Sequence, residues 1–487
     1  MTKEYNVIWD KLLSEERFRN STTTDNHRNS FQKDYDRIIY SSALRRLQDK
    51  TQVFPLQKND FIRTRLTHSL EASAIARSLG SLVGTKLIEK RIWDDENAIE
   101  RKNKLSSLLE VSGLVHDIGN PPFGHFGETI IREFFKKWIL QRKVDIKEFI
   151  GNDITDEELK VLFSDFIKFE GNAQGIRILT KLQRLNDKHG VNFTFGTLAT
   201  LMKYPWDSLN KLSENGKFGY FKSEKAKCEE IRKHIHLSNN SKHPVTLLLE
   251  ASDDIAYLFA DLEDAVKKGL ISWSKIKNKF NSENYCDNNI KEYIKKNKKF
   301  KNKDDLICMQ NFKIIIQGYF INEVCEEFIK NHNEILSGKY EGPLLTKSKK
   351  TCKMEKIIRS LCVDYAYSSK EVLKLEIIGN SILTTLLDIF VNSMFNLLVF
   401  YYKESDGKEN KERENIFNKT FKRSKSKDQK LFNLISDNFR DEQNLSYKLS
   451  KKDFLYKGIQ LIVDYISCMT DSYALNLHKQ ITGNMLL

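Results

Sequence analysis

Residues 108–128 read LLEVSGLVHDIGNPPFGHFGE, an apolar helical run that ends in His116 and Asp117. The Gly-Asn-Pro-Pro sequence that follows predicts a break in the helix before it restarts near His125. Adjacent helical residues point about 100° apart, so a neighbouring His and Asp rarely share a partner. A metal ion can be shared, because imidazole nitrogen and carboxylate oxygen converge on it. The alternative is a capped buried helix whose His bonds to its own turn.

Two other stretches carry the same chemistry. RTRLTHSLEAS places His68 on a predicted helix, and LLEASDDIAYLFADLEDA places Asp253 and Asp254 on an apolar helix. One His, then a His-Asp pair, then an Asp, each on its own helix, provide two imidazoles and two carboxylates. This mixture suits Mn, Fe, Mg, Co or Zn in a site that keeps open positions for water and substrate.

The composition predicts an all-α protein. The 487 residues include only 6 Pro and 21 Gly, with long stretches of Leu, Ile, Lys and Glu and no alternating strand pattern. We expect an N-terminal segment at residues 1–33 and a catalytic core at 34–268. Residues 269–487 should form a C-terminal helical region that completes the pocket and makes oligomer contacts, with a charged loop near 407–429.

The sequence favours a cytoplasmic protein. Charged residues near the N-terminus interrupt any signal peptide, and the 7 Cys are scattered without CxxC spacing, as reduced thiols are. One run, residues 381–402, is long enough to span a membrane. Asp388, Asn392 and Asn396 recur along one side of it, so we expect a buried helix with a polar edge and no membrane partner.

The formal net charge of +14 raises the question of polyanionic partners. Lysine runs at 291–303 and 403–430 lack aromatic residues at stacking spacing, which favours solvated surface. The functional alternative is attraction of a triphosphate substrate or of single-stranded DNA, since field strength follows the summed charge.

The motifs together resemble the HD-domain deoxynucleoside triphosphate triphosphohydrolases, and within them the bacterial deoxyguanosine triphosphate triphosphohydrolases (dGTPases). The similar segments are RRLQDKTQVFPL, RTRLTHSLE, HDIGNPPFGHFGE, FEGNAQGIR, EASDDIAY with ADLEDAV, and DYISCMTDSYAL. They extend over nearly the whole chain. The resemblance implies an HD-domain helical fold with additional C-terminal helices, and a homo-oligomer, most simply a hexamer.

The resemblance also implies the metal ligands. His68, His116, Asp117 and Asp253 match the family's ligand positions. Asp253 is preferred over Asp254 because the family keeps an acid two residues before Ile-Ala-Tyr. The expected cofactor is a divalent ion, Mn or Mg, with Co or Fe as alternatives.

A second pair, His125 and Glu128, matches the family's catalytic His-Glu pair. The two residues lie three apart and so share one helical face. A carboxylate behind a His raises its basicity and fixes its tautomer, as a proton-transfer residue requires. The structural alternative is that Glu128 only caps the helix.

Three basic or aromatic residues are candidates for the phosphates. Arg65 precedes His68 by three residues and can bind α-phosphate oxygens in a fork. The resemblance implies that Lys217 and Tyr220, in the Gly-bearing stretch GKFGYF, reach the outer phosphates, whereas the residues alone would indicate that Lys217 is ordinary surface.

Four residues are candidates for the sugar. In the family, a Gln followed by an apolar residue lies against the deoxyribose, and here the pair is Gln52 and Val53. Tyr257 and Asp261 follow Asp253 by four and eight residues and share its helical face. We expect Gln52 and Asp261 to bind the 3′-hydroxyl, while Val53 and Tyr257 exclude a 2′-hydroxyl.

The implied reaction is hydrolysis of dGTP, or another dNTP, to a deoxynucleoside and inorganic triphosphate. Water activated at the ion would attack the α-phosphorus, and His125 would transfer a proton. One alternative is a broad-specificity dNTPase or another HD-domain nucleotide phosphohydrolase. The other is a protein that binds single-stranded nucleic acid and carries a vestigial HD site.

Overall fold

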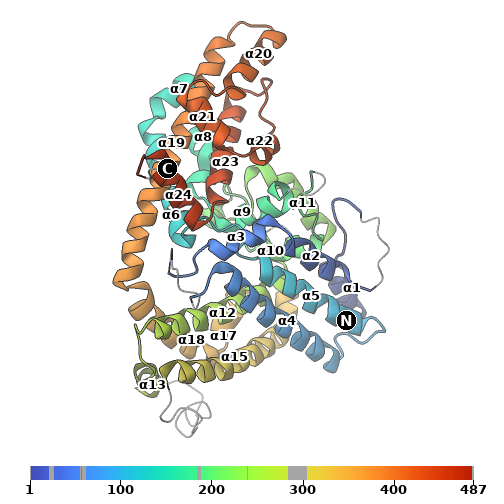
Figure 1. Cartoon of the computed structure of the whole chain (residues 1–487). Helices are drawn as coiled ribbons and strands as arrows, with labels where there is room; N and C mark the ends of the chain where they lie inside the picture. Colours follow the sequence, from blue (N-terminus) through green and yellow to red (C-terminus); the bar gives the residue numbers. More distant parts are fainter. Residues whose placement is uncertain are drawn as a thin grey trace. The chain divides into compact units, whose positions relative to one another are not determined.

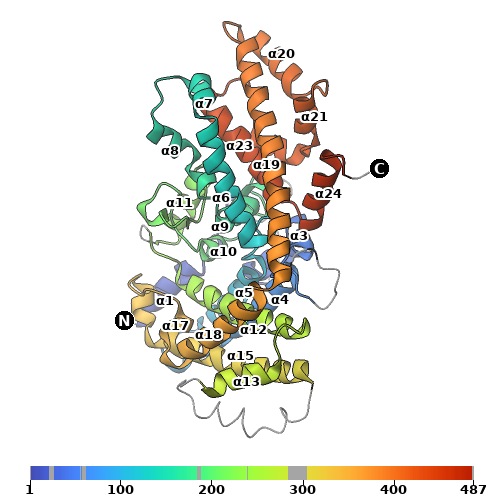
Figure 2. The ribbon, with the colours of Figure 1, turned by 90° about the vertical axis from the view of Figure 1, so that its left-hand side faces the viewer.

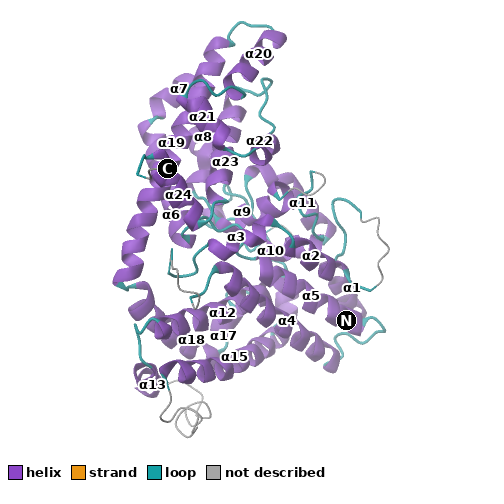
Figure 3. Ribbon diagram, viewed as in Figure 1, coloured by secondary structure: helices purple, strands orange, loops and turns teal. Residues whose placement is uncertain are grey.

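The computed structural model describes residues 2–20, 27–54, 56, 62–183, 188–237, 240–282 and 304–484. Within these ranges the protein consists of helices joined by turns and contains no strand (Figure 3). The nearest approach to sheet structure there is an isolated bridge between Thr51 and Thr64. The predicted all-α fold is therefore confirmed.

The chain forms two compact units, each assembled from segments that are distant in sequence. Unit 1 contains Met1–Asp117, Asn192–Pro205 and Ala226–Leu375, and unit 2 contains Ile118–Val191, Trp206–Lys225 and Glu376–Leu487. The functional division expected at residues 1–33, 34–268 and 269–487 stays a prediction, since compactness does not show which segments act in catalysis.

Unit 1 holds the helices that carry the predicted metal ligands (Figure 1). Its elements are α1 (Thr2–Leu12), α2 (Ser30–Ile39), α3 (Ser42–Arg46), η1 (Leu47–Asp49), α4 (Arg65–Glu89), α5 (Ala98–Val115), α10 (Phe195–Leu201), α11 (Lys225–His234, from its second residue), α12 (Pro244–Lys267), α13 (Trp273–Ser282), α15 (Asp305–Lys330), α16 (His332–Leu336), α17 (Leu344–Lys347), α18 (Lys349–Leu361) and η6 (Cys362–Tyr367).

Helices α4 and α5 pack closely next to the predicted ligands. A Cβ placed on Gly113 of α5 would lie only 2.8 Å from the Cα of Ser73 on α4, which is closer than side-chain atoms approach a backbone. The Ser73 hydroxyl also donates a 2.7 Å hydrogen bond to the Glu110 carbonyl of α5. Glycine at 113 therefore sets the distance between the two helices one turn before His116.

The ends of these helices are fixed by local hydrogen bonds. The Thr64 side chain caps α4 by accepting from the Thr67 amide, so that Arg65 opens the helix. Helix α12 begins at Pro244, where a missing amide costs nothing, after His243 whose ring accepts from Val245. Helix α5 ends at Val115, before the break that the sequence predicts at Gly119, so His116 follows the helix instead of lying on it.

Unit 2 holds the helix that carries His125 and Glu128. Its elements are α6 (Gly124–Gln141), α7 (Lys143–Ile150), α8 (Asp156–Ile167), α9 (Gly171–Arg177), η2 (Ile178–Leu182), η3 (Lys211–Ser213), η4 (Lys222–Glu224), most of α19 (Lys370–Glu404), α20 (Asn410–Phe421), α21 (Lys427–Leu434), α22 (Asp437–Gln443), α23 (Lys451–Ser467) and α24 (Asp471–Ile481).

Helices α6 and α19 run side by side in unit 2 (Figure 2). The Trp138 indole of α6 donates to Asn392 Oδ1 at 2.9 Å and meets the Phe395 ring edge to face at 5.8 Å. Among the described helices, α19 alone is long and apolar enough to cross a membrane, and 61% of its most apolar window is buried inside the protein. Asn392 also donates to Asp388, so the predicted buried helix with a polar edge is present.

The expectation of a charged loop near 407–429 is wrong, because α20 occupies most of that stretch. Phe417 and Phe421 lie four residues apart on one face of α20 and pack against Tyr401 of α19 and Phe454 of α23. The packing of these two aromatic rings thus stabilises a helix in a stretch that is rich in charged residues. The lysine run at 291–303 lies outside the described residues.

A fully buried ion network lies inside unit 2. The guanidinium of Arg177, on α9, donates to Asp464 Oδ2 of α23 at 2.8 Å and to Glu224 Oε1 at 2.5 Å. Arg177 and Asp464 are completely buried, and Gln174 and Gln443 also donate to Asp464. The network satisfies charges that would otherwise be left uncompensated.

Candidate metal centre and proton-transfer pair

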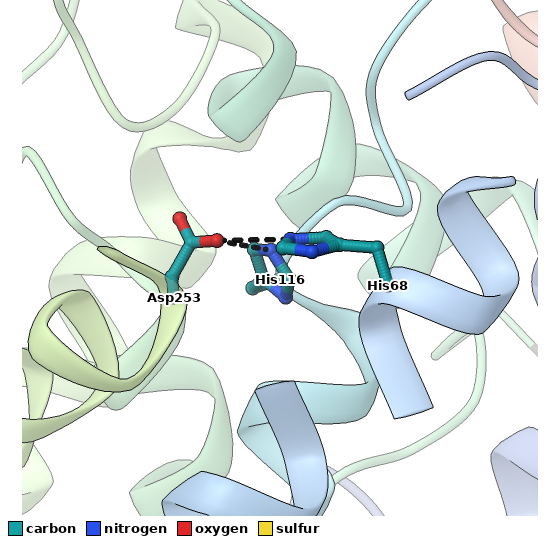
Figure 4. A group of neighbouring side chains, drawn as sticks. All are labelled: His68, His116 and Asp253. Atoms are coloured by element: carbon teal, nitrogen blue, oxygen red, sulfur yellow. Dashed lines mark hydrogen bonds and ion pairs between the residues drawn. The ribbon is translucent and has the colours of Figure 1, made fainter. Parts of the chain in front are cut away.

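Three helices of unit 1 bring His68, His116 and Asp253 together (Figure 4). His68 lies on the first turn of α4, His116 immediately follows α5, and Asp253 lies on α12. Asp253 Oδ1 is 3.0 Å from His68 Nε2 and 3.2 Å from His116 Nε2. One ligand atom from each residue lies within 4.8 Å of the others. An ion could therefore contact all three residues with little rearrangement.

The tautomer of His116 follows from its second nitrogen. His116 Nδ1 lies 2.8 Å from the Gly113 carbonyl, which can only accept, so Nδ1 carries a proton. In a neutral ring Nε2 then presents a lone pair towards the carboxylate oxygen of Asp253. Two lone pairs at 3.2 Å repel unless a cation lies between them, and the cation can be a proton or a metal ion. The donor set thus fits a divalent ion.

The electrostatics of the centre favour positive charge. Burial lowers the pKa of His116, but the carboxylates of Asp253 and Asp117 outweigh it and raise the pKa to about 9. Burial also opposes ionisation of Asp253, yet His116 and His68 hold its pKa well below the usual range. The His68 and His116 rings pack edge to face, with 5.3 Å between their centroids.

Asp117 stands apart from this group of three. Its Oδ2 accepts from the Arg65 guanidinium, and its Oδ1 is 3.6 Å from His116 Nε2. Burial raises the pKa of Asp117, but Arg65 and His116 hold it well below its usual value. Asp117 thus lies next to His116 but pairs with Arg65. The structure therefore joins a predicted metal ligand to the predicted phosphate-binding arginine.

In unit 2, His125 and Glu128 form the predicted pair at the start of α6. Phe123 and Gly124 both adopt positive φ, 62° and 59°, and this sharp turn begins the helix after the two prolines. His125 Nδ1 lies 3.2 Å from Glu128 Oε2. The His125 side chain is 69% exposed and that of Glu128 3%. The start of α6 has no side-chain cap, and Glu128 Oε1 accepts from the Gly171 amide at the start of α9, so Oε2 is the oxygen that faces the imidazole.

Of the residues expected at the sugar, Tyr257 lies next to the centre on α12, and Asp261 lies one turn later on the same helix. The Tyr257 ring is 6.4 Å from that of His68 and stacks on Tyr367 at 6.3 Å. The Tyr367 hydroxyl donates to Asp261 Oδ2 at 2.5 Å, and burial raises the pKa of Asp261 to about 7. Tyr367 lies 106 residues from Asp261, and no local pattern in the sequence indicated it.

Gln52 and Val53 lie between η1 and α4, both partly buried. Gln52 Oε1 is buried without a hydrogen-bond partner among the described residues. A buried oxygen that accepts no hydrogen bond destabilises the folded state, and this one is suited to accept a hydrogen bond from a ligand. No hydrogen bond joins Gln52 to Tyr257 or Asp261 in the described part of the chain.

The remaining phosphate candidates lie in unit 2. Lys217 Nζ pairs with the buried Glu170 Oε2 at 2.8 Å, so its charge already has a partner, and Tyr220 is buried. Arg132, which the sequence analysis overlooked, donates to Glu128 Oε2 at 3.2 Å. It follows Glu128 by four residues, a helical spacing that could have identified it.

Comparison with known proteins places these residues in a family. A family model described as the HD domain matches residues 65–179. A Listeria innocua protein is 37% identical over 98% of this chain and 99% of its own length, and a Synechocystis protein is 32% identical over 98% and 99%. Both are named deoxyguanosinetriphosphate triphosphohydrolase-like protein. A Salmonella paratyphi A protein named deoxyguanosinetriphosphate triphosphohydrolase is 29% identical over 93% of each chain.

The matched HD-domain segment contains His68, His116 and Asp117, and the similarity to the three relatives covers nearly the whole chain. The all-α architecture and the His-Asp centre agree with this match. The chain therefore belongs to the HD-domain family of deoxyguanosinetriphosphate triphosphohydrolase-like proteins.

Proposed function

We propose that this protein is a metal-dependent hydrolase that converts dGTP to deoxyguanosine and inorganic triphosphate. The observation that carries the proposal is the convergence of His68, His116 and Asp253 on a common point, in a chain similar throughout to proteins named for that reaction. The alternative, a vestigial site on a nucleic-acid-binding protein, has less support, because three of the four predicted ligands converge.

In the proposed site, His68, His116 and Asp253, joined by Asp117, hold a divalent ion, Mn or Mg. When bound, the ion polarises phosphate oxygens and lowers the pKa of water. His116 contributes its Nε2, since its Nδ1 is occupied by the Gly113 carbonyl. Arg65 pairs with Asp117 and is the residue proposed to bind an α-phosphate oxygen.

His125 is the proposed proton carrier. Because Nδ1 faces the Glu128 carboxylate, Nε2 is the nitrogen that exchanges a proton with the attacking or leaving oxygen. The exposure of the imidazole is consistent with contact to a substrate from solvent. Lys217 would contribute positive charge for the outer phosphates, in competition with its pair to Glu170.

The proposed sugar site consists of Gln52, Val53, Tyr257 and Asp261. The buried Gln52 oxygen is suited to accept from a 3′-hydroxyl. Asp261 is fully buried and already accepts from Tyr367, so it would bind the sugar only through its other oxygen. The Tyr257 ring, next to His68, is proposed to exclude a 2′-hydroxyl.

The test is a panel of the four deoxynucleoside triphosphates and GTP with Mn, Mg and Co, with products resolved by chromatography. The proposal predicts preference for dGTP, little turnover of GTP, and intact triphosphate as a product. Equal efficiency with all four deoxynucleotides would indicate the broad-specificity alternative. No turnover together with salt-sensitive binding of single-stranded DNA would favour the nucleic-acid alternative.

The family also suggests a setting for the enzyme. We propose a cytoplasmic homo-oligomer, a hexamer by analogy with the family. Light scattering coupled to size-exclusion chromatography measures the mass directly, and a monomer of 57.0 kDa would contradict the proposed assembly.

A further inference from the structure

Behind the His125–Glu128 pair, unit 2 contains a second buried carboxylate. Glu170 is fully buried at the start of α9, and Glu128 is buried as well. One nitrogen of the Arg132 guanidinium connects them: Nη2 donates to Glu128 Oε2 at 3.2 Å and to Glu170 Oε2 at 3.3 Å. Two acids thus share one cation in a site that water barely reaches.

Uncharged groups donate hydrogen bonds to the second oxygen of each carboxylate. The Gly171 amide donates to Glu128 Oε1 at 2.7 Å, and the Asn172 amide group donates to Glu170 Oε1 at 2.6 Å. A Cβ on Gly171 would lie 2.7 Å from Glu128 Oε1, so only glycine permits this approach. Arg132 is itself anchored, because its Nε donates to the Phe169 carbonyl at 2.6 Å.

The charges of the cluster balance. The charged groups that face Glu128 are His125 and Arg132 on its own helix, Glu170 at the start of α9, and Lys217 from the loop before η4, which lies 2.8 Å from Glu170. Two carboxylates are thus matched by two permanent cations. Burial raises the pKa of Glu128, but His125, Lys217 and Arg132 lower it to about 2, whereas burial and Glu128 raise the pKa of Glu170.

We propose that Arg132 and Lys217 neutralise Glu170 and thereby keep Glu128 as the carboxylate that holds His125 ready for proton transfer. Arg132 and Glu170 are then positioning residues for His125. The inference rests on the proposed function of His125 and extends it to a specific electrostatic support. It also assigns Lys217 a second role, beside the contribution proposed for it at the outer phosphates.

Removing one cation should unbalance the cluster. In Arg132→Gln, two buried acids face one lysine, so one of them takes up a proton. Once Glu128 shares that proton it holds His125 poorly, and kcat should fall about 10-fold or more at pH 7. The acidic limb of the kcat profile should move up by about one pH unit or more. Adding Glu170→Gln removes the excess negative charge and should restore both quantities.

The experiment compares the unchanged protein with Arg132→Gln and with the double variant Arg132→Gln/Glu170→Gln. Lys136→Gln is the matched control, since it removes one cation from the same helix, one turn later and on the surface, where Lys136 pairs with Glu133. Lys217→Gln, alone and with Glu170→Gln, repeats the comparison at a more exposed cation if Arg132→Gln does not fold.

Thermal unfolding between pH 5.5 and 8 provides a readout independent of turnover. A buried carboxyl whose folded pKa rises above its unfolded value destabilises the protein above the unfolded pKa, and the destabilisation is relieved as protonation occurs. The Tm deficit of Arg132→Gln should therefore be larger at pH 8 than at pH 5.5, by about 2 °C or more. The double variant and Lys136→Gln should show no such pH dependence.

Restoration of kcat and loss of the pH-dependent Tm deficit in the double variant would support the inference. Defects that persist unchanged when Glu170 is also replaced would overturn it. Absence of nucleotide turnover in the unchanged protein would overturn the proposed function and with it the role assigned to His125. In that case the Tm series still decides whether the cluster is charge-balanced.

Discussion

Metal binding should release a proton from His116. The number of protons released per ion depends on the pKa of His116 in the metal-free protein. Asp253 and Asp117 raise the pKa of His116 to about 9, so almost every metal-free molecule carries this proton at pH 7. An ion that binds Nε2 must displace it. Each pH unit below the pKa should then weaken apparent metal affinity about tenfold, or about 1.4 kcal/mol. An ordinary histidine, with a pKa near 6.5, would release only about a quarter of a proton at pH 7.

Isothermal titration calorimetry measures this release directly, by titrating Mn into metal-free protein at pH 7 and 8 in buffers of different ionisation enthalpy. We expect about one proton or more per ion and a Kd about tenfold tighter at pH 8. In Asp253→Asn, the main source of the raised pKa is absent, so residual binding should release less. A Kd independent of pH, or a release near a quarter of a proton at pH 7, would refute the reasoning.

The same raised pKa gives the sign of the stability change in the metal-free protein. The protonated His116 contributes stability that is fully present below about pH 6.5 and is lost as pH rises through about 9. Because the ion competes with this proton for Nε2 and binds more tightly at higher pH, added metal should stabilise the protein more at pH 8 than at pH 7. A stabilisation that decreases over this interval would contradict the proton–metal competition.

Three further predictions address the proton carrier, the sugar site and the core. His125→Ala should keep metal content but lower kcat about 100-fold or more, and near-normal kcat would leave the residue with a structural role. Tyr257→Ala should narrow the ratio of kcat/KM between dGTP and GTP while lowering both, and an unchanged ratio would remove it from sugar discrimination. Arg177→Met leaves Asp464 and Glu224 buried without their cation, and should lower the free energy of unfolding measured in urea by about 3–5 kcal/mol. A loss below about 1 kcal/mol would contradict this, because it would show that the two acids find other partners or become solvated.

The sequence predicted the part of the site that rests on local pattern. His68 and Asp253 lie on predicted helices and His116 directly follows one, and packing of those helices brings the three residues together. The break after Asp117 and the spacing of His125 and Glu128 are likewise local. The resemblance to a known family supplied the order of these pieces along the chain.

Long-range pairings could not be predicted in the same way. Tyr367 reaches Asp261 across 106 residues, and Lys217 reaches Glu170 across 47. The resemblance to a known family suggested that Lys217 reaches a phosphate, whereas in the structure the lysine pairs with a buried acid. The loop expected at 407–429 is wrong for a related reason, because the charges of this stretch are local and the aromatic rings that hold α20 come from distant helices.

The central claim, that the His-Asp centre holds the ion on which dGTP hydrolysis depends, is tested most directly by measuring metal content and product formation on the same preparation of His116→Ala. The account predicts about one ion per chain and release of deoxyguanosine with intact triphosphate in the unchanged protein, and neither in the variant, with helical content preserved by circular dichroism. Full metal occupancy and normal triphosphate release in His116→Ala would contradict it.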